Sequence, residues 1–275
     1  MTILDKIVAQ KYLEVKERKY LSPVNLLEKG ILFQRKPFSL KNFLLRKDLF
    51  GIIAEFKRKS PSKGVMNEFA TSGQVCGEYI QAGASAVSVL TDSDFFGGSS
   101  ADLINARGFI DSPILRKEFI VDEYQIVEAR AIGADAILLI TSFHTAERVE
   151  QLFKFATSLG LEVLIEVHDE NDFSRIPSDA QLVGINSRNL ASLDVDFDRL
   201  SVLIDNIPPD VVKIAESGIK STSDYLMLEN AGFNGFLIGE LLMNTADPGK
   251  TCRTFIEELR DLRFPIAETN KSTGQ

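Results

Sequence analysis

Lysines and carboxylates recur where short apolar runs end in this 275-residue chain. In FGIIAEFK, for example, Glu55 and Lys57 follow a stretch that has the composition of a buried strand. Burying an unpaired charge is costly, whereas ammonium and carboxylate groups placed together in a partly dry pocket can hold pKa values suited to proton transfer. The sequence therefore predicts acid–base chemistry. The candidate catalytic residues are Glu55, Lys57, Lys117, Glu166, Asn186 and Glu216, with Arg188 beside them.

Eight apolar runs alternate with amphipathic segments from residue 49 onward. The runs are FGIIAEFK, AVSVLTD, SPILRKEFI, AILLI, EVLIEVH, LVGINS, VKIAESG and GFLIGE. Their continuous apolar stretches are typical of parallel strands covered on both faces. Helices are predicted at residues 71–82, 100–110, 122–132, 145–159, 170–176, 197–206, 221–231 and 248–262. The alternation predicts an α/β fold, a (β/α)8 TIM barrel, and a doubly wound open sheet is the alternative.

Such a barrel brings the charged residues together. The carboxyl ends of its strands line the catalytic face, and alternate side chains point inward. One charged residue at a strand end is more often a solvated rim group than a catalyst. Because such groups end five of the eight runs, a shared polar pocket is the favoured interpretation.

Three loops on the same face indicate a phosphate site. SPSKG follows the first run, ESGIKS the seventh and IGE the eighth, and they offer hydroxyl and backbone N–H groups. TIM barrels frequently bind phosphate at the loops after the last two strands. A phosphorylated small molecule is therefore the predicted ligand.

Four other polar residues lie near these positions. His168 ends EVLIEVH and can be read as a base, but loop solvation or helix capping is the favoured interpretation. Lys213 has the opposite strand parity to Glu216 and is predicted to be structural or outward-facing. Arg58 and Lys59 are predicted to be rim or loop charges.

Residues 1–48 do not share the repeat. ILDKIVAQKYLEVKERKY reads as an amphipathic helix and SPVNLLEKG as a short second one, with a further helix possible at residues 39–46. The predicted organisation is a helical extension packed on the barrel at residues 1–48, the barrel at 49–264 and a flexible tail at 265–275.

Composition excludes several classes of protein. A net charge of −8 argues against nucleic-acid binding. Two cysteines and two histidines do not support a disulfide framework or a His-rich metal site, and no cofactor is expected. There is no apolar stretch of about 18 residues that would span a membrane, and no signal peptide is recognised. A monomer in the cytoplasm is the prediction.

The sequence resembles the indole-3-glycerol-phosphate synthase family. The resemblance is carried, in order, by ILDKIVAQK, AEFKRKSPSKG, LTDSDFFGGS, PILRKEFI, LIEVH, GINSRNL, IAESGI and FLIGELLM, which together span nearly the whole chain. It implies a carboxy-lyase of tryptophan biosynthesis. The implied reaction closes 1-(2-carboxyphenylamino)-1-deoxyribulose 5-phosphate to indole-3-glycerol phosphate with loss of CO2 and water.

The resemblance also implies roles for the candidate residues. Lys117 would be the general acid that protonates the substrate carbonyl, and Glu166 the acid/base of the dehydration. Lys57, beside Glu55, would meet the substrate carboxylate. Asn186 and Arg188 would orient the substrate, and Glu216 would hold the lysine network or a ribulose hydroxyl. The implied substrate-binding residues are Ser60, Phe96, Phe119, Arg188, Ser217, Gly218, Ile238, Gly239 and Glu240, of which the two phenylalanines would pack on the anthranilate ring.

Two positions depart from the family pattern. Ser187 stands where the family often has a second Asn, and the expected effect is mild. Glu240 stands where some members have Ser. A carboxylate would repel a phosphate unless only its backbone N–H faces the ligand.

Two alternatives from other classes stay open at this point. One is a phosphate-binding barrel aldolase that uses Lys57 or Lys117 as a Schiff-base nucleophile. The other is a barrel that has lost catalysis and serves as a binding subunit. The full set of charged strand-end residues argues against the second alternative.

Overall fold

The computed structural model describes residues 3–61, 63–188 and 197–264. The tail predicted at residues 265–275 lies outside this part of the chain. Among the helices described, none has the length and apolar character needed to span a membrane.

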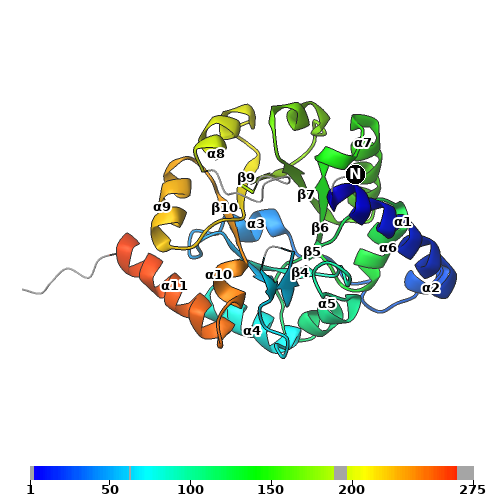
Figure 1. The fold of residues 1–275 in the computed structure, drawn as a ribbon, viewed down its shortest axis with the longest axis horizontal. Coiled ribbons are helices and arrows are strands. Elements are labelled where there is room, and N and C mark those ends of the chain that lie inside the picture. The colour runs from blue at the N-terminus through cyan, green and yellow to red at the C-terminus, as the bar shows by residue number, and fades with distance from the viewer. Residues whose placement is uncertain (1–2, 62, 189–196, 265–275) are drawn as a thin grey trace, which may run out of the picture.

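Eight parallel strands close into a barrel, so the predicted (β/α)8 TIM barrel is confirmed (Figure 1). Around the barrel the strands follow the order β1, β10, β9, β8, β7, β6, β5 and β4, and β4 pairs with β1 to close it. The strands are β1 Ile52–Phe56, β4 Ala86–Leu90, β5 Ile114–Lys117, β6 Ala136–Ile140, β7 Glu162–Val167, β8 Leu182–Asn186, β9 Val212–Glu216 and β10 Gly235–Ile238.

Helices follow the strands and surround the barrel (Figure 1). Four of them are followed by a glycine with positive φ, at Gly83, Gly133, Gly160 and Gly232, a conformation that commonly ends a helix and that glycine adopts without strain. The helices are α4 Ser72–Ala82, α5 Ser100–Arg107, α6 Glu123–Ala131, α7 Ala146–Ser158, α8 Phe197–Leu203, α9 Thr222–Asn230, α10 Glu240–Met243 and α11 Pro248–Arg263. Single 3-10 turns occur at η1 Thr141–Phe143 and η3 Ile204–Asn206.

The segment predicted as a helix at residues 170–176 differs from the other seven. It is a 3-10 helix, η2 Glu170–Arg175, that begins at a capping box formed by Asp169 and Asp172. Ile176 precedes a proline and is extended, which ends the segment.

Side chains alternate between the barrel interior and the helical layer, as the period of a strand dictates. In β1, Ile53 belongs to the interior cluster, whereas Ile52 and Ala54 pack under the helices. Leu40 and Leu44 of α3 (Leu40–Leu44) close the amino-terminal end of the barrel. The other interior residues are Ala86, Leu115, Ala136, Leu138, Ile140, Leu164, Leu182, Val212, Ile214 and Leu237.

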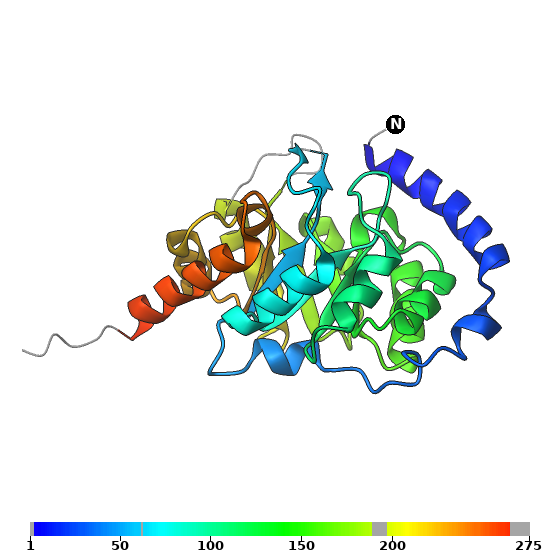
Figure 2. The same cartoon turned by 90° about the horizontal axis from the view of Figure 1, so that it is seen from below.

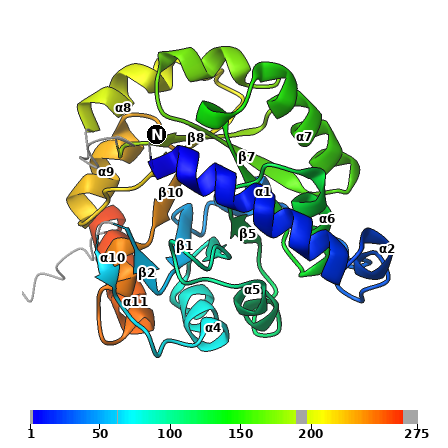
Figure 3. The ribbon, with the colours of Figure 1, turned by 45° about the vertical axis from the view of Figure 1, so that its right-hand side comes forward.

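Two features lie at the other, carboxyl-terminal end. After β1 the chain forms a small antiparallel hairpin, β2 (Lys59–Ser60) with β3 (Gly64–Val65), where a loop was predicted. Helix α1 (Ile3–Leu21), joined by α2 (Val24–Leu27) to the segment leading to α3, runs from this end down the outside of the barrel (Figures 2 and 3). Figure 2 shows the hairpin and the start of α1 at one end of the molecule and α3 at the other. The extension thus contributes to both ends of the barrel.

Candidate active site

A cavity of about 530 Å3 opens at the carboxyl-terminal ends of the strands. Fourteen of the fifteen residues predicted for the site line it, and the remaining one, Glu216, contacts the cavity residue Lys117. The fourteen are Glu55, Lys57, Ser60, Phe96, Lys117, Phe119, Glu166, Asn186, Arg188, Ser217, Gly218, Ile238, Gly239 and Glu240. The barrel therefore gathers the dispersed sequence candidates into one pocket.

Lys117 lies at the centre of the charged cluster. Its Nζ is 2.9 Å from Oε2 of Glu166 and 2.5 Å from Oε2 of Glu216, although the three residues come from three different strands. Burial lowers the pKa of Lys117, but the two carboxylates raise it by more, so the net shift is upward. The lysine is held as an ammonium ion with its protons directed at the pocket's carboxylates.

Glu166 is held on three sides. Besides Lys117, its carboxylate accepts a hydrogen bond from Asn186 Nδ2 at 3.0 Å, and His168 Nε2 lies 3.1 Å from Oε1. Burial raises the pKa of Glu166, but Lys117, His168 and Asn186 lower it by more, and the carboxyl is held well below its usual range. Glu166 is thus an ionised carboxylate that is available to accept a proton.

The favoured prediction for His168, loop solvation or helix capping, is wrong. The side chain is buried, at 7% exposure, and its ring contacts Glu166 from behind the cavity wall. One residue, Val167, separates Glu166 from His168 at the end of β7, so both side chains point to the same side. Burial next to the carboxylate makes His168 a neighbour of the reaction centre that holds Glu166 in place.

Glu216 is the second carboxylate on Lys117. Burial and the neighbouring Glu166 raise the pKa of Glu216 to about 8, against the opposing effect of Lys117. Two carboxyl groups that share one ammonium in a buried cluster resist ionising together, so Glu216 holds a proton more strongly than Glu166 does.

Gly184 in β8 makes room for Glu216. A Cβ at this position would lie 2.1 Å from Glu216 Oε1 and 3.2 Å from a methyl carbon of Leu164. Because Lys117 and the barrel wall hold Glu216 in place, an added methyl group must displace the carboxylate.

We expect Gly184→Ala to lower kcat/KM by about 10- to 100-fold, because small displacements of catalytic groups are this costly. Gly77→Ala is the matched control, since Gly77 lies within helix α4 and its Cβ would meet nothing closer than 3.9 Å. Steady-state kinetics of the two variants checks the prediction. Equal activity in both variants would contradict it.

Glu55 and Lys57 form a second ion pair across the pocket. Lys57 Nζ is 2.6 Å from Glu55 Oε1, and both side chains are mostly buried. Gly239 is required beside them, because a Cβ there would lie 2.3 Å from the same oxygen. The prediction that parity divides the charges of this segment agrees with the geometry: Arg58 turns away to make two hydrogen bonds to Asp102, and Lys59 donates to the Asp94 carbonyl.

The loops predicted to bind phosphate lie side by side at one edge of the cavity. Ser217 has a φ of 71°, a left-handed conformation that is rare for a residue with a side chain, and Gly218 follows with a φ of 80°. Arg188 Nη2 is 3.2 Å and Lys63 Nζ 3.4 Å from the carboxylate of Glu240. These two cations offset the negative charge of Glu240 and so reduce its repulsion of an anionic ligand.

Two aromatic rings form the opposite wall. The ring centroids of Phe96 and Phe119 are 6.0 Å apart, and Phe119 lies 6.4 Å from Phe143. Leu4 and Ile7 of helix α1 complete this apolar part of the lining. The strand-end rule missed these two residues because α1 precedes the repeat on which the rule depends.

Ser187, one of the two departures from the family pattern, is fully buried. Its hydroxyl donates to the carbonyl oxygens of Glu216 and Ser217, at 3.1 Å and 3.0 Å. It therefore braces the turn that carries both residues. Among the described residues, no group of three or more His, Cys, Asp or Glu side chains is arranged to hold a metal ion.

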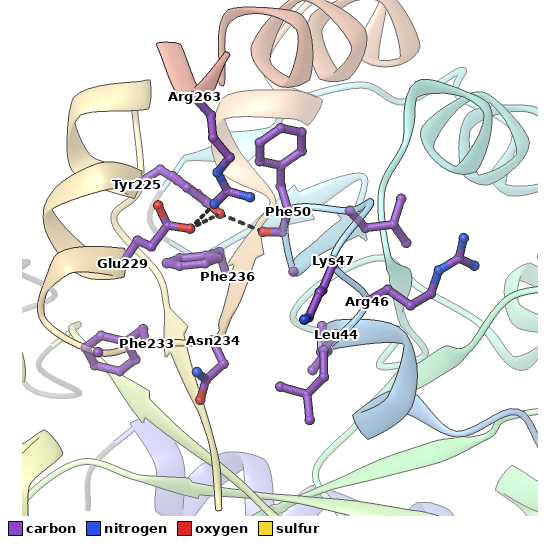
Figure 4. A pocket seen from close by; sticks show the side chains of 14 residues that line it. Leu44, Arg46, Lys47, Phe50, Tyr225, Glu229, Phe233, Asn234, Phe236 and Arg263 are labelled. Carbon is purple, nitrogen blue, oxygen red and sulfur yellow. Dashed lines mark hydrogen bonds and ion pairs between the residues drawn. The ribbon is translucent and has the colours of Figure 1, made fainter. Parts of the chain in front are cut away.

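A second cavity, of about 340 Å3, lies at the amino-terminal end of the barrel (Figure 4). The hydroxyl of Tyr225 is 2.9 Å from the Phe50 carbonyl oxygen and 3.1 Å from Glu229, which also pairs with Arg263. The guanidinium of Arg263 stacks on the Phe50 ring. These contacts join α9, α11 and the segment before β1, which indicates a structural role.

The fold and the charged cavity define a TIM-barrel enzyme with acid–base groups at the carboxyl ends of its strands. The family model described as indole-3-glycerol phosphate synthase matches residues 4–255, and the chain belongs to this family of carboxy-lyases. A relative of that name from Bacteroides thetaiotaomicron is 43% identical over 258 residues, covering 94% of this chain and 99% of its own. One from Campylobacter fetus subsp. fetus is 41% identical over 242 residues, covering 88% and 94%.

Solved structures of low sequence identity share the fold. The alpha subunit of tryptophan synthase from Legionella pneumophila has a TM-score of 0.58 at 14% identity, covering 81% of this chain and 97% of its own. Thiamine phosphate pyrophosphorylase from Pyrococcus furiosus has a TM-score of 0.56 at 15% identity, covering 80% and 99%. These likenesses support the barrel architecture alone.

Proposed function

We propose that the pocket closes 1-(2-carboxyphenylamino)-1-deoxyribulose 5-phosphate to indole-3-glycerol phosphate and that Lys117 is the general acid of the ring closure. The observation that carries the assignment of the acid is the position of Lys117 Nζ, between two buried carboxylates and at the cavity surface. An ammonium in this position can give a proton to a carbonyl oxygen and recover one from its neighbours.

The reaction balances without an added redox partner. The ring carbon that bears the carboxylate attacks the substrate carbonyl carbon while Lys117 protonates the carbonyl oxygen. Loss of CO2 then returns the bonding electrons to the ring. Departure of the new hydroxyl group as water needs one proton, which comes from solvent because the reaction consumes one proton overall. Removal of a proton from the adjacent carbon completes the pyrrole double bond.

Glu166 is the group proposed to take that last proton. Its carboxylate is ionised, faces the cavity and lies within hydrogen-bond distance of Lys117 and Asn186. Lys117 can then be reprotonated through the same contact. Glu216 supports this exchange by holding Lys117 from the other side.

The other pocket residues are proposed to bind the ends of the substrate. Lys57 would meet the substrate carboxylate until CO2 leaves, with Glu55 holding the lysine in position. Phe96 and Phe119 would pack on the anthranilate ring. The phosphate would lie at the loops after β9 and β10, near Ser60, Ile238 and Gly239 and next to the cations paired with Glu240.

A Schiff-base aldolase that uses Lys117 is disfavoured by the same geometry. A lysine nucleophile must lose its proton, and the two carboxylates raise the pKa of Lys117 instead. Borohydride reduction in the presence of a keto-sugar phosphate tests this directly. A covalent adduct on Lys57 or Lys117 would favour the aldolase.

The chain contains no tryptophan, so the formation of indole can be followed by fluorescence over a low protein background. We expect the purified protein to turn over the carboxyphenylamino substrate at a kcat of roughly 1–10 s⁻¹, in the range typical of enzymes. The product is checked by its absorption spectrum and mass. A protein that binds the substrate but yields no indole product would contradict the proposed function.

We also propose a cellular location and an oligomeric state for the protein. We place the protein in the cytoplasm, as composition predicts, and as a monomer, because the described residues of one chain supply both the acid–base groups and the aromatic wall. Light scattering at micromolar protein concentration tests the second statement.

A further inference from the structure

Lys11 of helix α1 is an ammonium group in an unusual place. Its side chain is 1% exposed, and its Nζ contacts three carboxylates: Asp92 at 2.7 Å, Glu14 at 3.0 Å and Glu118 at 3.1 Å. The ammonium donates a hydrogen bond to Glu14 and forms ion pairs with Asp92 and Glu118. Burial lowers the pKa of Lys11, but these carboxylates raise it by more, and the lysine stays charged.

Two of the three carboxylates belong to the barrel, and each holds the backbone of an aromatic wall residue. Asp92 follows β4, and its Oδ1 accepts hydrogen bonds from the backbone N–H of Phe95 at 2.7 Å and of Phe96 at 3.0 Å. Glu118 follows Lys117, and its Oε1 accepts from the backbone N–H of Phe119 at 2.9 Å. Lys11 therefore binds directly to the two groups that fix Phe96 and Phe119.

We propose that Lys11 is a positioning residue for the aromatic wall of the pocket, acting through Asp92 and Glu118. It joins the ends of two adjacent strands, from outside the barrel, at the point where the rings of Phe96 and Phe119 come within 6.0 Å of each other. Without the Lys11 ammonium, the buried carboxylates of Asp92 and Glu118 would lose the cation that lies between them. Each would then reorient toward water or toward Arg116. The loop of Phe96 and the backbone of Phe119 would move with them.

The attachment of α1 to the barrel does not depend on Lys11 alone. Farther along the helix, Val15 packs on Val121 and Tyr124, and Lys19 pairs with Asp122. Arg18 pairs with Glu128, which also binds Arg116. A variant of Lys11 can therefore lose the link to the aromatic wall while the helix remains docked.

The chain offers a matched pair of variants. Lys11→Met removes the ammonium and keeps an unbranched side chain, and Lys11→Arg keeps the charge. Arg18→Met makes the same kind of change two turns later on the same helix, at a side chain that reaches Glu14 and Glu128 and does not contact Asp92 or Glu118. Comparison of Lys11→Met with Arg18→Met separates positioning of the wall from docking of the helix.

Because the proposal rests on the proposed function, the test combines kinetics with a measurement that needs no turnover. In Lys11→Met we expect KM to rise about tenfold while kcat changes by less than about threefold, since the wall binds the ring and does not transfer protons. Hydrogen exchange of the segments 93–97 and 118–120 should speed up about tenfold or more. Lys11→Arg should recover most of the wild-type KM, and Arg18→Met should change neither quantity.

Unchanged KM and exchange in Lys11→Met would overturn the proposal, as would the same changes in Arg18→Met. If Lys11→Met does not fold, Asp92→Asn serves instead, because its amide oxygen can still accept from Phe95 and Phe96 but no longer carries a charge for Lys11. An unaltered KM in that variant would also overturn the proposal. A wild-type protein without turnover would refute the proposed function, and the exchange measurement would still decide the role of Lys11.

Discussion

Replacing Lys117 by alanine is expected to lower kcat by about 10²- to 10⁴-fold, the usual contribution of a general acid. The variant loses the proton donor and leaves Glu166 and Glu216 without the ammonium that now holds both of them. Indole fluorescence measured under single-turnover conditions gives the loss in the chemical step. Circular dichroism establishes whether the fold is retained.

Alanine variants of two other lysines serve as comparisons for Lys117→Ala. Lys57→Ala should reduce activity less, because Lys57 is proposed to bind the carboxylate and pairs with a single glutamate. Lys213→Ala should leave turnover unchanged, because that side chain is on β9 but does not line the cavity. A Lys117→Ala protein with near wild-type kcat would refute the assignment of the acid, and a strong effect of Lys213→Ala would indicate a general effect on the barrel.

Replacing Glu166 by glutamine is expected to lower kcat by about 10²- to 10⁴-fold as well. The amide keeps the size of the side chain, but it has one acceptor oxygen for the donors Lys117 and Asn186 in place of two, and it cannot accept a proton at neutral pH. Because the ionised carboxylate holds Lys117 at 2.9 Å, its loss also weakens recovery of the acid. Stopped-flow fluorescence and mass analysis of the trapped species show whether ring closure or dehydration is slowed.

Glu162→Gln is the control for this variant. Glu162 begins the same strand at the opposite end of the barrel, where its carboxylate accepts from Ser39 Oγ and from the backbone N–H of Lys41. This change should lower stability toward urea and leave kcat unaltered. If Glu166→Gln has a normal kcat and no intermediate accumulates, Glu166 has no part in the proposed mechanism.

Much of the fold could be predicted because the barrel repeats its signals. Each strand is an apolar run, each helix has its own period, and glycine marks four of the joints, so an error in one element does not displace the next. Helix η2 is the exception, because an α-helix was predicted at residues 170–176 and the chain forms a 3-10 helix that ends before Pro177. The pocket residues could be predicted for the same reason, because one rule about strand ends applies to every strand.

The sequence by itself determined which side chains meet at the barrel mouth, because strand parity and the carboxyl-end rule are local properties that the barrel then repeats. Only the tertiary structure decided which charges pair. It placed His168 against Glu166, gave Lys117 two carboxylates and brought Lys11 from a helix outside the repeat to Asp92 and Glu118. The contacts of Lys117 and Lys11 join residues far apart in the chain through side chains whose directions no local pattern encodes, and they exist only once the barrel has closed and α1 has docked on it.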